Sequence, residues 1–144
     1  MKPIERRRLN EGALPELLGY RLRLAQQAVF RDFAASVQGL SPGRVGLLIT
    51  IDANPGITQS RLAESAGRHR STMVGVLDQL EARGLLERRR GEDRRTNGLW
   101  LTRAGRELLG RALRAIERHE RRIAAHLSAA EKRQLLALLG KISR

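Results

Sequence analysis

Residues 58–102 constrain the fold more than any other stretch, because they predict two short helices and a hairpin in immediate succession. The first helix is expected to begin at Thr58, whose hydroxyl can accept a backbone hydrogen bond, and Gly67 permits the turn after it. Its expected buried residues are Leu62, Ala63 and Ala66. The second helix has apolar residues at helical spacing, Met73, Val76, Leu77 and Leu80. The stretch therefore predicts a helix-turn-helix followed by a two-stranded ribbon.

The outward face of the second helix is polar and cationic. It carries Arg68, His69, Arg70, Ser71, Thr72, Gly75 and Gln79. Arginine can read guanine in the major groove of DNA, and hydroxyls can contact base edges or phosphates. Two helices joined by a tight turn can place the second one in that groove. We therefore predict that residues 68–72 contact double-stranded DNA.

The hairpin is rich in arginine. Its cations are Arg88, Arg89, Arg90, Arg94 and Arg95, against the acids Glu92 and Asp93. Such a loop suits phosphates or a minor groove. Strand residues alternate between faces, so we expect two of the first three arginines, Arg88 and Arg90, to follow one phosphate path. Gln59 and Ser60 lie at a helix start, where backbone amides favour phosphate, although helix capping explains them equally well.

The charge of the whole chain is consistent with a polyanionic partner but does not locate the interface. A formal charge of +13 on 144 residues attracts nucleic acid, although codon bias alone can inflate the arginine content. Residues 103–144 hold 11 basic and 4 acidic residues, far from the hairpin. The arginines at 103, 106, 111, 114 and 118 are either a solvated face or a field that guides DNA or an anionic effector.

Several classes of function are disfavoured by what the sequence lacks. The absence of cysteine removes disulfides, thiolate metal sites and thiol-based sensing. His119 and His126, seven residues apart on one expected helix, have no matched carboxylates, so we expect no metal and no cofactor. No nucleophile, paired carboxylates or phosphate loop indicates an enzyme. Without an apolar span or signal-like segment, we expect a cytoplasmic protein with no membrane contact.

The flanking segments predict four more helices around one core. Residues 1–12 are expected to form an arm, and residues 13–37 a helix. The next helix, capped by Ser41, should bury Val45, Leu48 and Ile49 before residues 54–56 end it. A helix over 103–127 has the expected inward stripe Leu109, Leu113, Ile116, Ile123 and Leu127, supported by Ala104, Leu108 and Ala112. A last helix from Ser128 should form a hairpin with it and turn inward Leu135, Leu138, Leu139 and Ile142.

The helix over 13–37 has two apolar stripes. One consists of Leu14, Leu18, Leu22, Ala25, Val29 and Phe33, and the other of Leu17, Leu24, Ala28 and Ala35. A surface helix of a monomer needs only one such stripe. The second stripe therefore predicts contact with another copy of the chain, a homodimer.

In this order of elements the chain resembles the MarR family of transcription regulators over nearly its whole length. The matching segments are residues 40–42, 54–59, 62–63, 70–72, 77–85, 93–95 and 101–102. Each is ordinary alone, but together in this spacing they are specific. The resemblance implies a mainly α fold with a small β wing in one unit of residues 1–144. It also implies a winged helix-turn-helix at 41–102, dimerisation helices at 1–38 and 103–144, and a homodimer on near-palindromic DNA.

The resemblance also assigns roles in the hairpin. It implies that Asp93 and Arg95 brace the wing, while Arg94 enters the minor groove. One departure lies in the recognition helix, where Val74-Gly75 replaces the Thr-Arg common in relatives. A glycine inside a helix costs about 1 kcal/mol relative to alanine. Base reading is therefore expected to depend on Arg68, His69, Arg70, Thr72 and the wing.

The expected function is a sequence-specific, ligand-responsive repressor, with an architectural DNA-binding protein without an effector as the alternative. A single-stranded RNA module is disfavoured, because aromatic residues make up only 3% of the chain. Residues 18–23 and 28–30 look similar to family members that control the catabolism of aromatic acids. We therefore expect a small anionic aromatic effector, with Arg21 or Arg23 contacting its carboxylate and Tyr20 or Phe30 its ring.

Overall fold

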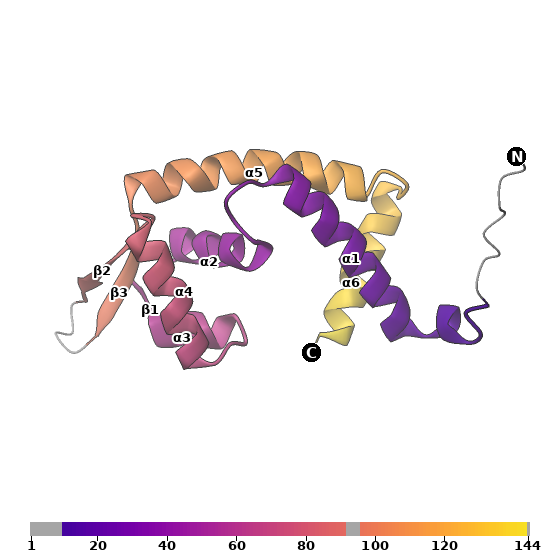
Figure 1. Ribbon diagram of the computed structural model, residues 1–144, viewed down its shortest axis with the longest axis horizontal. Helices are drawn as coiled ribbons and strands as arrows, with labels where there is room; N and C mark the ends of the chain where they lie inside the picture. The colour runs from indigo at the N-terminus through magenta and orange to yellow at the C-terminus, as the bar shows by residue number, and fades with distance from the viewer. Residues whose placement is uncertain (1–9, 92–95, 144) are drawn as a thin grey trace, which may run out of the picture.

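The computed structural model describes residues 10–91 and 96–143 (Figure 1). After a short 3-10 helix, Leu14–Glu16, its elements are α1 Leu18–Ser36, α2 Pro42–Ala53, β1 Ile57–Thr58, α3 Gln59–Ser65, α4 Arg70–Ala82, β2 Leu86–Arg90, β3 Asn97–Leu101, α5 Arg103–Ile123 and α6 Ala129–Ile142. The predicted class, mainly α with a small β wing, is confirmed. Most of the expected N-terminal arm, and the residues Asp93, Arg94 and Arg95, lie outside the described residues.

Short polar side chains begin four of the helices. The hydroxyls of Ser41, Thr58 and Thr102 accept hydrogen bonds from backbone amides three residues ahead. Ser128 forms a complete capping box with Glu131, whose carboxylate accepts from the Ser128 amide at 2.7 Å. These bonds satisfy amides that have no partner in the first turn of a helix. The predicted helix starts at these positions are confirmed.

The N-terminal helix begins later than predicted. Pro15 lies in the 3-10 helix, and Leu17 has extended backbone, so the continuous helix starts at Leu18 and not at residue 13. Of its apolar residues only Phe33 is buried, while Leu18 and Leu24 remain exposed. One stripe therefore packs weakly against the same chain, and the other is left uncovered.

The wing is part of a three-stranded antiparallel sheet in the order β1-β3-β2, whereas a two-stranded ribbon was expected. The two residues of β1 pair with Leu99 and Gly98, and such a short strand leaves no periodic signal in the sequence. Trp100 packs over two glycines at the base of the wing. A Cβ added at Gly98 or Gly56 would lie 2.5 or 2.9 Å from its ring, so both positions require glycine.

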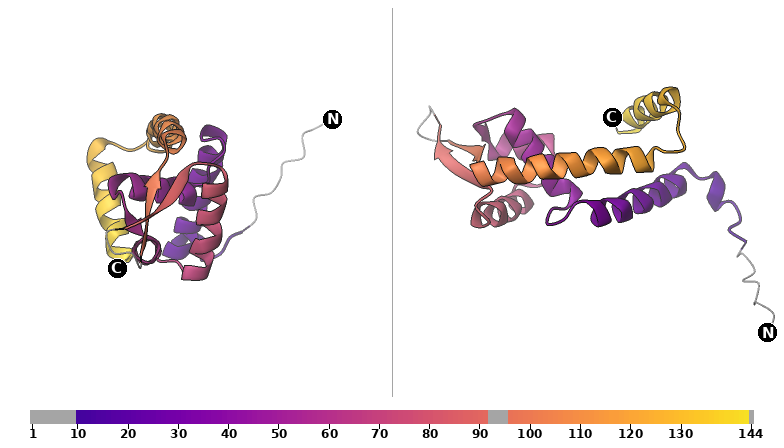
Figure 2. Two further views of the ribbon diagram at one scale, coloured as in Figure 1. Left: turned by 90° about the vertical axis from the view of Figure 1, so that its left-hand side faces the viewer. Right: turned by 90° about the horizontal axis from the view of Figure 1, so that it is seen from above.

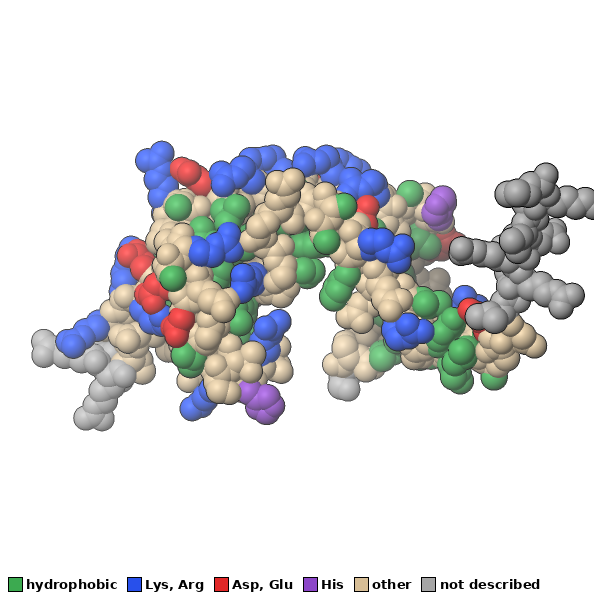
Figure 3. Space-filling view, viewed as in Figure 1, with side chains coloured by type: hydrophobic (Ala, Val, Ile, Leu, Met, Phe, Trp, Pro, Cys, Tyr) green, Lys and Arg blue, Asp and Glu red, His purple; other side chains and the backbone are tan. Residues whose placement is uncertain are grey.

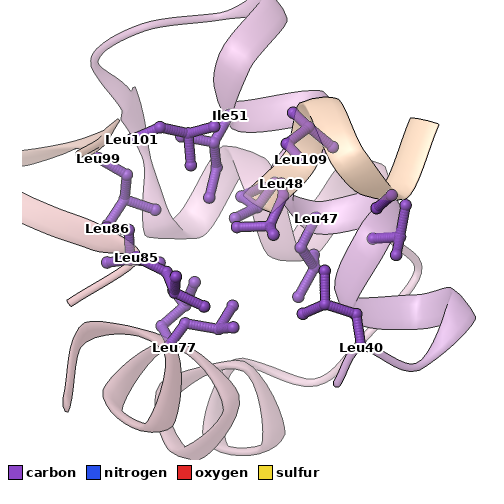
Figure 4. Packing of buried hydrophobic residues seen from close by; sticks show 14 of the residues in the cluster. Leu40, Leu47, Leu48, Ile51, Leu77, Leu85, Leu86, Leu99, Leu101 and Leu109 are labelled. Atoms are coloured by element: carbon purple, nitrogen blue, oxygen red, sulfur yellow. The ribbon is translucent and has the colours of Figure 1, made fainter. Parts of the chain in front are cut away.

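The hydrophobic core joins the end of α1, the helices α2, α3 and α4, the sheet, and α5 as far as Ala115 (Figure 4). Its most deeply buried side chains are Leu48, Ile51, Leu62, Met73, Leu77, Leu80, Leu86 and Leu99. Two expectations were wrong. In α2, Ile49 was expected to be buried but is exposed, whereas Leu47 and Ile51 are buried, because the buried side of the helix extends the other way around it. Ala66, also expected to be buried, is exposed beside the Gly67 turn.

The long helix α5 runs from the wing to the terminal helices (Figures 1 and 2). Its buried residues are Gly105, Leu109, Ala112, Ala115 and His119. Leu113 is exposed, contrary to prediction, because it lies to one side of this stripe, and Ala104 is also exposed. The helix ends at Ile123, so His126 is not on it and does not share a face with His119.

The side chains of α6 are exposed in the single chain. Leu135, Leu138, Leu139 and Ile142, expected to be inward, are 36 to 51% exposed. Lys132 contacts Glu120 at 3.2 Å, but the chain turns away from α5 after residue 127 and no side chain of α6 is buried. The expected packed hairpin of the two terminal helices is therefore wrong for an isolated chain.

A polar cluster fastens α1 to α5. The Asp32 carboxylate lies 2.6 Å from Nδ1 of the buried His119 and accepts two hydrogen bonds from Arg122, at 2.9 and 3.1 Å. Ser36 donates to the same carboxylate, and the Phe33 ring meets His119 edge to face. Hydrogen bonds from Arg122 and His119 hold the pKa of Asp32 well below its ordinary value of 3.8.

Replacing Asp32 with asparagine is expected to lower the melting temperature at pH 7 by several degrees. The folded pKa is depressed, so the carboxylate stabilises the fold above the unfolded pKa of 3.8, and this contribution is lost as the pH falls below it. Thermal unfolding at pH 7 and pH 3 should therefore show a difference between variant and parent that shrinks in acid. An equal difference at both values would contradict the assigned ion pair.

Candidate nucleic-acid interface

The turn between α3 and α4 presents a cluster of exposed polar residues. Gly67 adopts a left-handed conformation, with φ of +59°, and the Arg68 amide donates to Ala63 O at 3.0 Å. This turn brings the start of α4 to the end of α3 at the lower edge of the molecule in Figure 1. The five predicted contact residues are all exposed: Arg68, His69, Arg70, Ser71 and Thr72. The structure thus brings these five residues together.

The first turn of α4 has no side-chain cap. His69 occupies the N-cap position but accepts no hydrogen bond from the helix. The backbone amides of residues 70–72 are therefore open to a ligand, and the helix dipole favours an anion there. Arg68 and Arg70 add positive charge on either side of His69. This geometry suits a phosphate at the helix start and base edges beside it.

The opposite end of α4 is braced by ion pairs. Arg88 of β2 contacts Asp78 at 2.6 Å and also pairs with Glu81. Gln79, on the outward face of α4, accepts a hydrogen bond from Arg44 of α2. The wing and α2 are thereby fixed to the helix that presents the polar cluster. Arg88 contributes to the position of the wing, and its role as a direct DNA contact stays a prediction.

Arg90 lies further along the wing and is exposed. In the described part of the chain its side chain has no ion pair, whereas Arg89 pairs with Glu87 and lies over Trp100 at 5.5 Å. Arg90 faces Asn97 across the ladder, next to the hairpin tip. It is thus the strand arginine best placed to reach a phosphate. The predicted tip residues Asp93, Arg94 and Arg95 lie outside the described residues.

At the start of α3, different residues are available for helix capping and for phosphate binding. Thr58 supplies the cap, because its hydroxyl accepts from the Arg61 amide at 3.3 Å. Gln59 is half-buried and Ser60 is exposed, and neither side chain caps the helix. Ser60 therefore remains available to a phosphate.

The proposed effector residues do not converge within one chain. Tyr20 donates to Glu11 at 3.0 Å, and this bond raises its pKa. Arg23 lies over the Tyr20 ring at 5.1 Å, while Arg21 donates to Pro15 O at 2.7 Å. Phe30 is 49% exposed, nearly three turns further along α1. The arginine and ring pair of Arg23 and Tyr20 is thus present, and a site that includes Phe30 would need additional surface.

Sequence reasoning missed the partners that position the interface. Asp78, Glu81 and Arg44 hold α4, the wing and α2 together, and none of them was predicted to do so. A signal was available for the first two, since Asp78 and Glu81 lie three residues apart, on one side of α4, and precede an arginine-rich strand. The Arg44 contact spans 35 residues of sequence and has no local signal.

The described residues contain neither a helix long and apolar enough to cross a membrane nor a group of three potential metal ligands. Within this part of the chain, His119 is instead engaged by Asp32.

The chain is similar in sequence and structure to known transcriptional regulators. The model of the MarR family matches residues 40–96. A putative transcriptional regulatory protein for the hcr operon of Thauera aromatica is 39% identical over 140 residues, which cover 94% of this chain and 84% of the relative. Among solved structures, the transcriptional repressor CouR bound to a 23-mer DNA duplex is 42% identical, with a TM-score of 0.90 over 95% of this chain and 99% of CouR.

A second structure of CouR, bound to p-coumaroyl-CoA, is 40% identical with a TM-score of 0.87, and the match covers 95% of this chain and 99% of CouR. The family consists of transcriptional regulators, so the expectation that this chain is not an enzyme is confirmed. The helix-turn-helix, the wing and these relatives identify the chain as a member of the MarR family of winged helix-turn-helix transcriptional regulators.

Proposed function

We propose that the protein is a homodimeric, ligand-responsive repressor that binds a near-palindromic DNA operator. The observation that carries the proposal is the exposed cluster at residues 68–72, which lies at an uncapped helix start beside a cationic wing. Arg70, Ser71 and Thr72 would contact base edges or phosphates in the major groove. Arg94 would enter the minor groove, and Arg90 would contact a neighbouring phosphate. The DNA-bound structure of CouR, a repressor of similar sequence, supports this assignment.

The apolar surface of the terminal helices supports the dimer. A hollow of about 540 Å³ lies between α1, the end of α5 and α6. Its apolar lining is Leu22, Ala25, Val29, Ile123, Ala124, Leu127, Leu135, Leu136 and Leu139. Monomeric proteins rarely leave such a continuous apolar surface in water. A second copy would cover it, with residues 1–38 and 103–144 as dimerisation helices and 41–102 as the DNA-binding region. Two α4 helices would then enter successive major grooves about 34 to 36 Å apart.

Arg70→Ala is expected to weaken binding to an operator selected from random duplexes by roughly 10- to 100-fold and to relax its base preference. Arg94→Ala should lower the salt slope of binding by about 1 with less effect on preference. Titrations at several salt concentrations test both. Arg133→Ala, which removes one exposed charge from α6, serves as the control. Unchanged affinity and preference of Arg70→Ala would refute base reading by α4, and an architectural protein would show little preference in any variant.

Gly75→Ala tests whether the glycine in α4 allows DNA to approach the helix backbone closely. Gly75 is exposed and a Cβ there would meet nothing within 4 Å, so alanine should stabilise the free protein by about 1 kcal/mol. If DNA approaches the backbone at this point, the same methyl group should weaken operator binding. Urea unfolding and operator titration of the variant give the two values. A variant that is no more stable than the parent would contradict the geometry of α4.

We propose an aromatic anion as the effector, either a free acid or its CoA thioester. The proposal is supported by the p-coumaroyl-CoA bound to CouR and by the Arg23 and Tyr20 pair on α1. Thermal shift and release from operator would be measured with benzoates, cinnamates and nicotinates, each as acid and as thioester. Release by one form and not the other would identify the ligand class. No stabilisation and no release by any of them would refute the proposal.

A further inference from the structure

The outer face of α5 forms a row of arginines along the edge of the molecule opposite the tips of α3 and α4 (Figure 3). We define this α5 ridge as Arg103, Arg106, Arg111, Arg114, Arg118 and Arg121. All six residues are exposed. The buried stripe of α5 lies on the other side of the helix, so the ridge has no part in the core.

Within the described residues, four of the six ridge arginines have no ion pair. Arg103 pairs with Glu107, Arg121 pairs with Glu117, and Arg106 donates to the carbonyl of Leu101. Within the described residues, no ion pair or hydrogen bond involves the side chains of the other three, Arg111, Arg114 and Arg118. Like charges three or four residues apart weaken a helix, so this arrangement opposes the stability of α5.

The ridge also has a shape that suits a bound anion. Four of its arginines, with Glu107 and Gly110, line an open hollow of about 520 Å³. Gly110 contributes no side chain to this hollow. From Arg103 to Arg121 the helix rises about 27 Å, a length over which one DNA strand carries about eight phosphates. No aromatic side chain belongs to the ridge, which disfavours stacking on unpaired bases.

We propose that the α5 ridge binds the phosphate backbone of a second DNA duplex without regard to sequence. The operator is assigned to α4 and the wing, and the ridge runs along the edge of the molecule opposite the tips of α3 and α4, so one protein molecule can hold two duplexes at once. The charge complementarity and the length of the ridge favour a duplex over a small anion. The operator contact belongs to the proposed function, but binding by the ridge does not depend on it.

The first test is a bridging assay with the full chain. Protein is loaded on an immobilised operator duplex and washed, and capture of a fluorescent duplex of unrelated sequence is measured at 50 mM salt. The ridge variant Arg111→Gln/Arg114→Gln/Arg118→Gln, which leaves the Arg106 contact with β3 intact, should lose at least 10-fold in capture while its operator affinity changes less than twofold. The matched variant with lysine at the same three positions keeps the charge and should retain capture. No capture by the parent, or equal capture by the glutamine variant, would overturn the proposal.

A second measurement works even when no operator is bound. For an unrelated duplex, the slope of log affinity against log salt should be smaller by about 3 in the glutamine variant, since about 0.9 of a counterion is released per phosphate contact. An unchanged slope would overturn the proposal. Binding of ATP to the ridge, with the duplex slope unchanged, would also overturn it in favour of a small polyphosphate. Failure of operator binding with a reduced slope would refute the proposed function alone.

Discussion

Gly105→Ala is expected to lower the free energy of unfolding by about 3 kcal/mol, a large effect for one methyl group. A Cβ at this position would lie 2.9 Å from the Leu85 carbonyl carbon and nearer still to its oxygen. The oxygen cannot easily move, because it accepts a hydrogen bond from the Thr102 amide at 3.2 Å. Thr102 also donates from its hydroxyl to Gly84 O at 2.6 Å. The methyl group would therefore separate the start of α5 from the end of α4.

Urea unfolding of purified protein measures this effect, and Gly110→Ala is the matched control. Gly110 lies on the same helix, but a Cβ there meets only the flexible Arg114 side chain at 3.7 Å. The control should therefore be as stable as the parent or up to about 1 kcal/mol more stable. Equal stability of the two alanine variants would show that α5 does not approach Leu85 as closely as described.

Leu135→Glu is expected to raise the dissociation constant of the proposed dimer by at least about 100-fold and to abolish tight operator binding. Leu135 is 44% exposed in the single chain, so glutamate there should change the stability of the isolated fold little. In a symmetric dimer the same change would bury an unpaired carboxylate twice, at a cost of several kcal/mol. A protein reduced to one recognition helix would hold one half-site only.

Sedimentation equilibrium of Leu135→Glu, with operator titration of the same sample, separates the interface from the fold. Gln134→Glu is the control, since it places the same residue at the neighbouring exposed position on the polar side of α6. The control should remain dimeric and bind operator. A Leu135→Glu protein that stays dimeric at low micromolar concentration would exclude α6 from the interface.

Local signals allowed much of the fold to be predicted from the sequence. Ser41, Thr58, Thr102 and Ser128 each cap a helix through contacts within three residues, which sequence order alone reveals. Periodicity alone did not predict which side of a helix is buried, because that side depends on where the neighbouring elements lie. Ile49 and Leu113 fit an apolar pattern, yet both lie beside the buried arc of their helices.

The residues of the candidate interface could be predicted from the sequence, but the contacts that hold them in position could not. Residues 68–72 were expected to be exposed together, and they are, because a turn at a left-handed glycine places them at one corner. The engagement of Arg88 by Asp78 was not predictable, since strand alternation describes faces and not partners. Effector residues stay a prediction, because Tyr20 is bonded to Glu11 and Phe30 lies nearly three turns further along α1, so the two side chains do not converge within one chain.

In the proposed complex, two chains present two α4 helices to one face of a duplex. The mass of the complex between the protein and a selected operator, measured by native mass spectrometry, tests it most directly. We predict two chains per operator duplex, and one chain on an operator cut to a single half-site. A single chain bound with full affinity to the intact operator would contradict the proposed dimer.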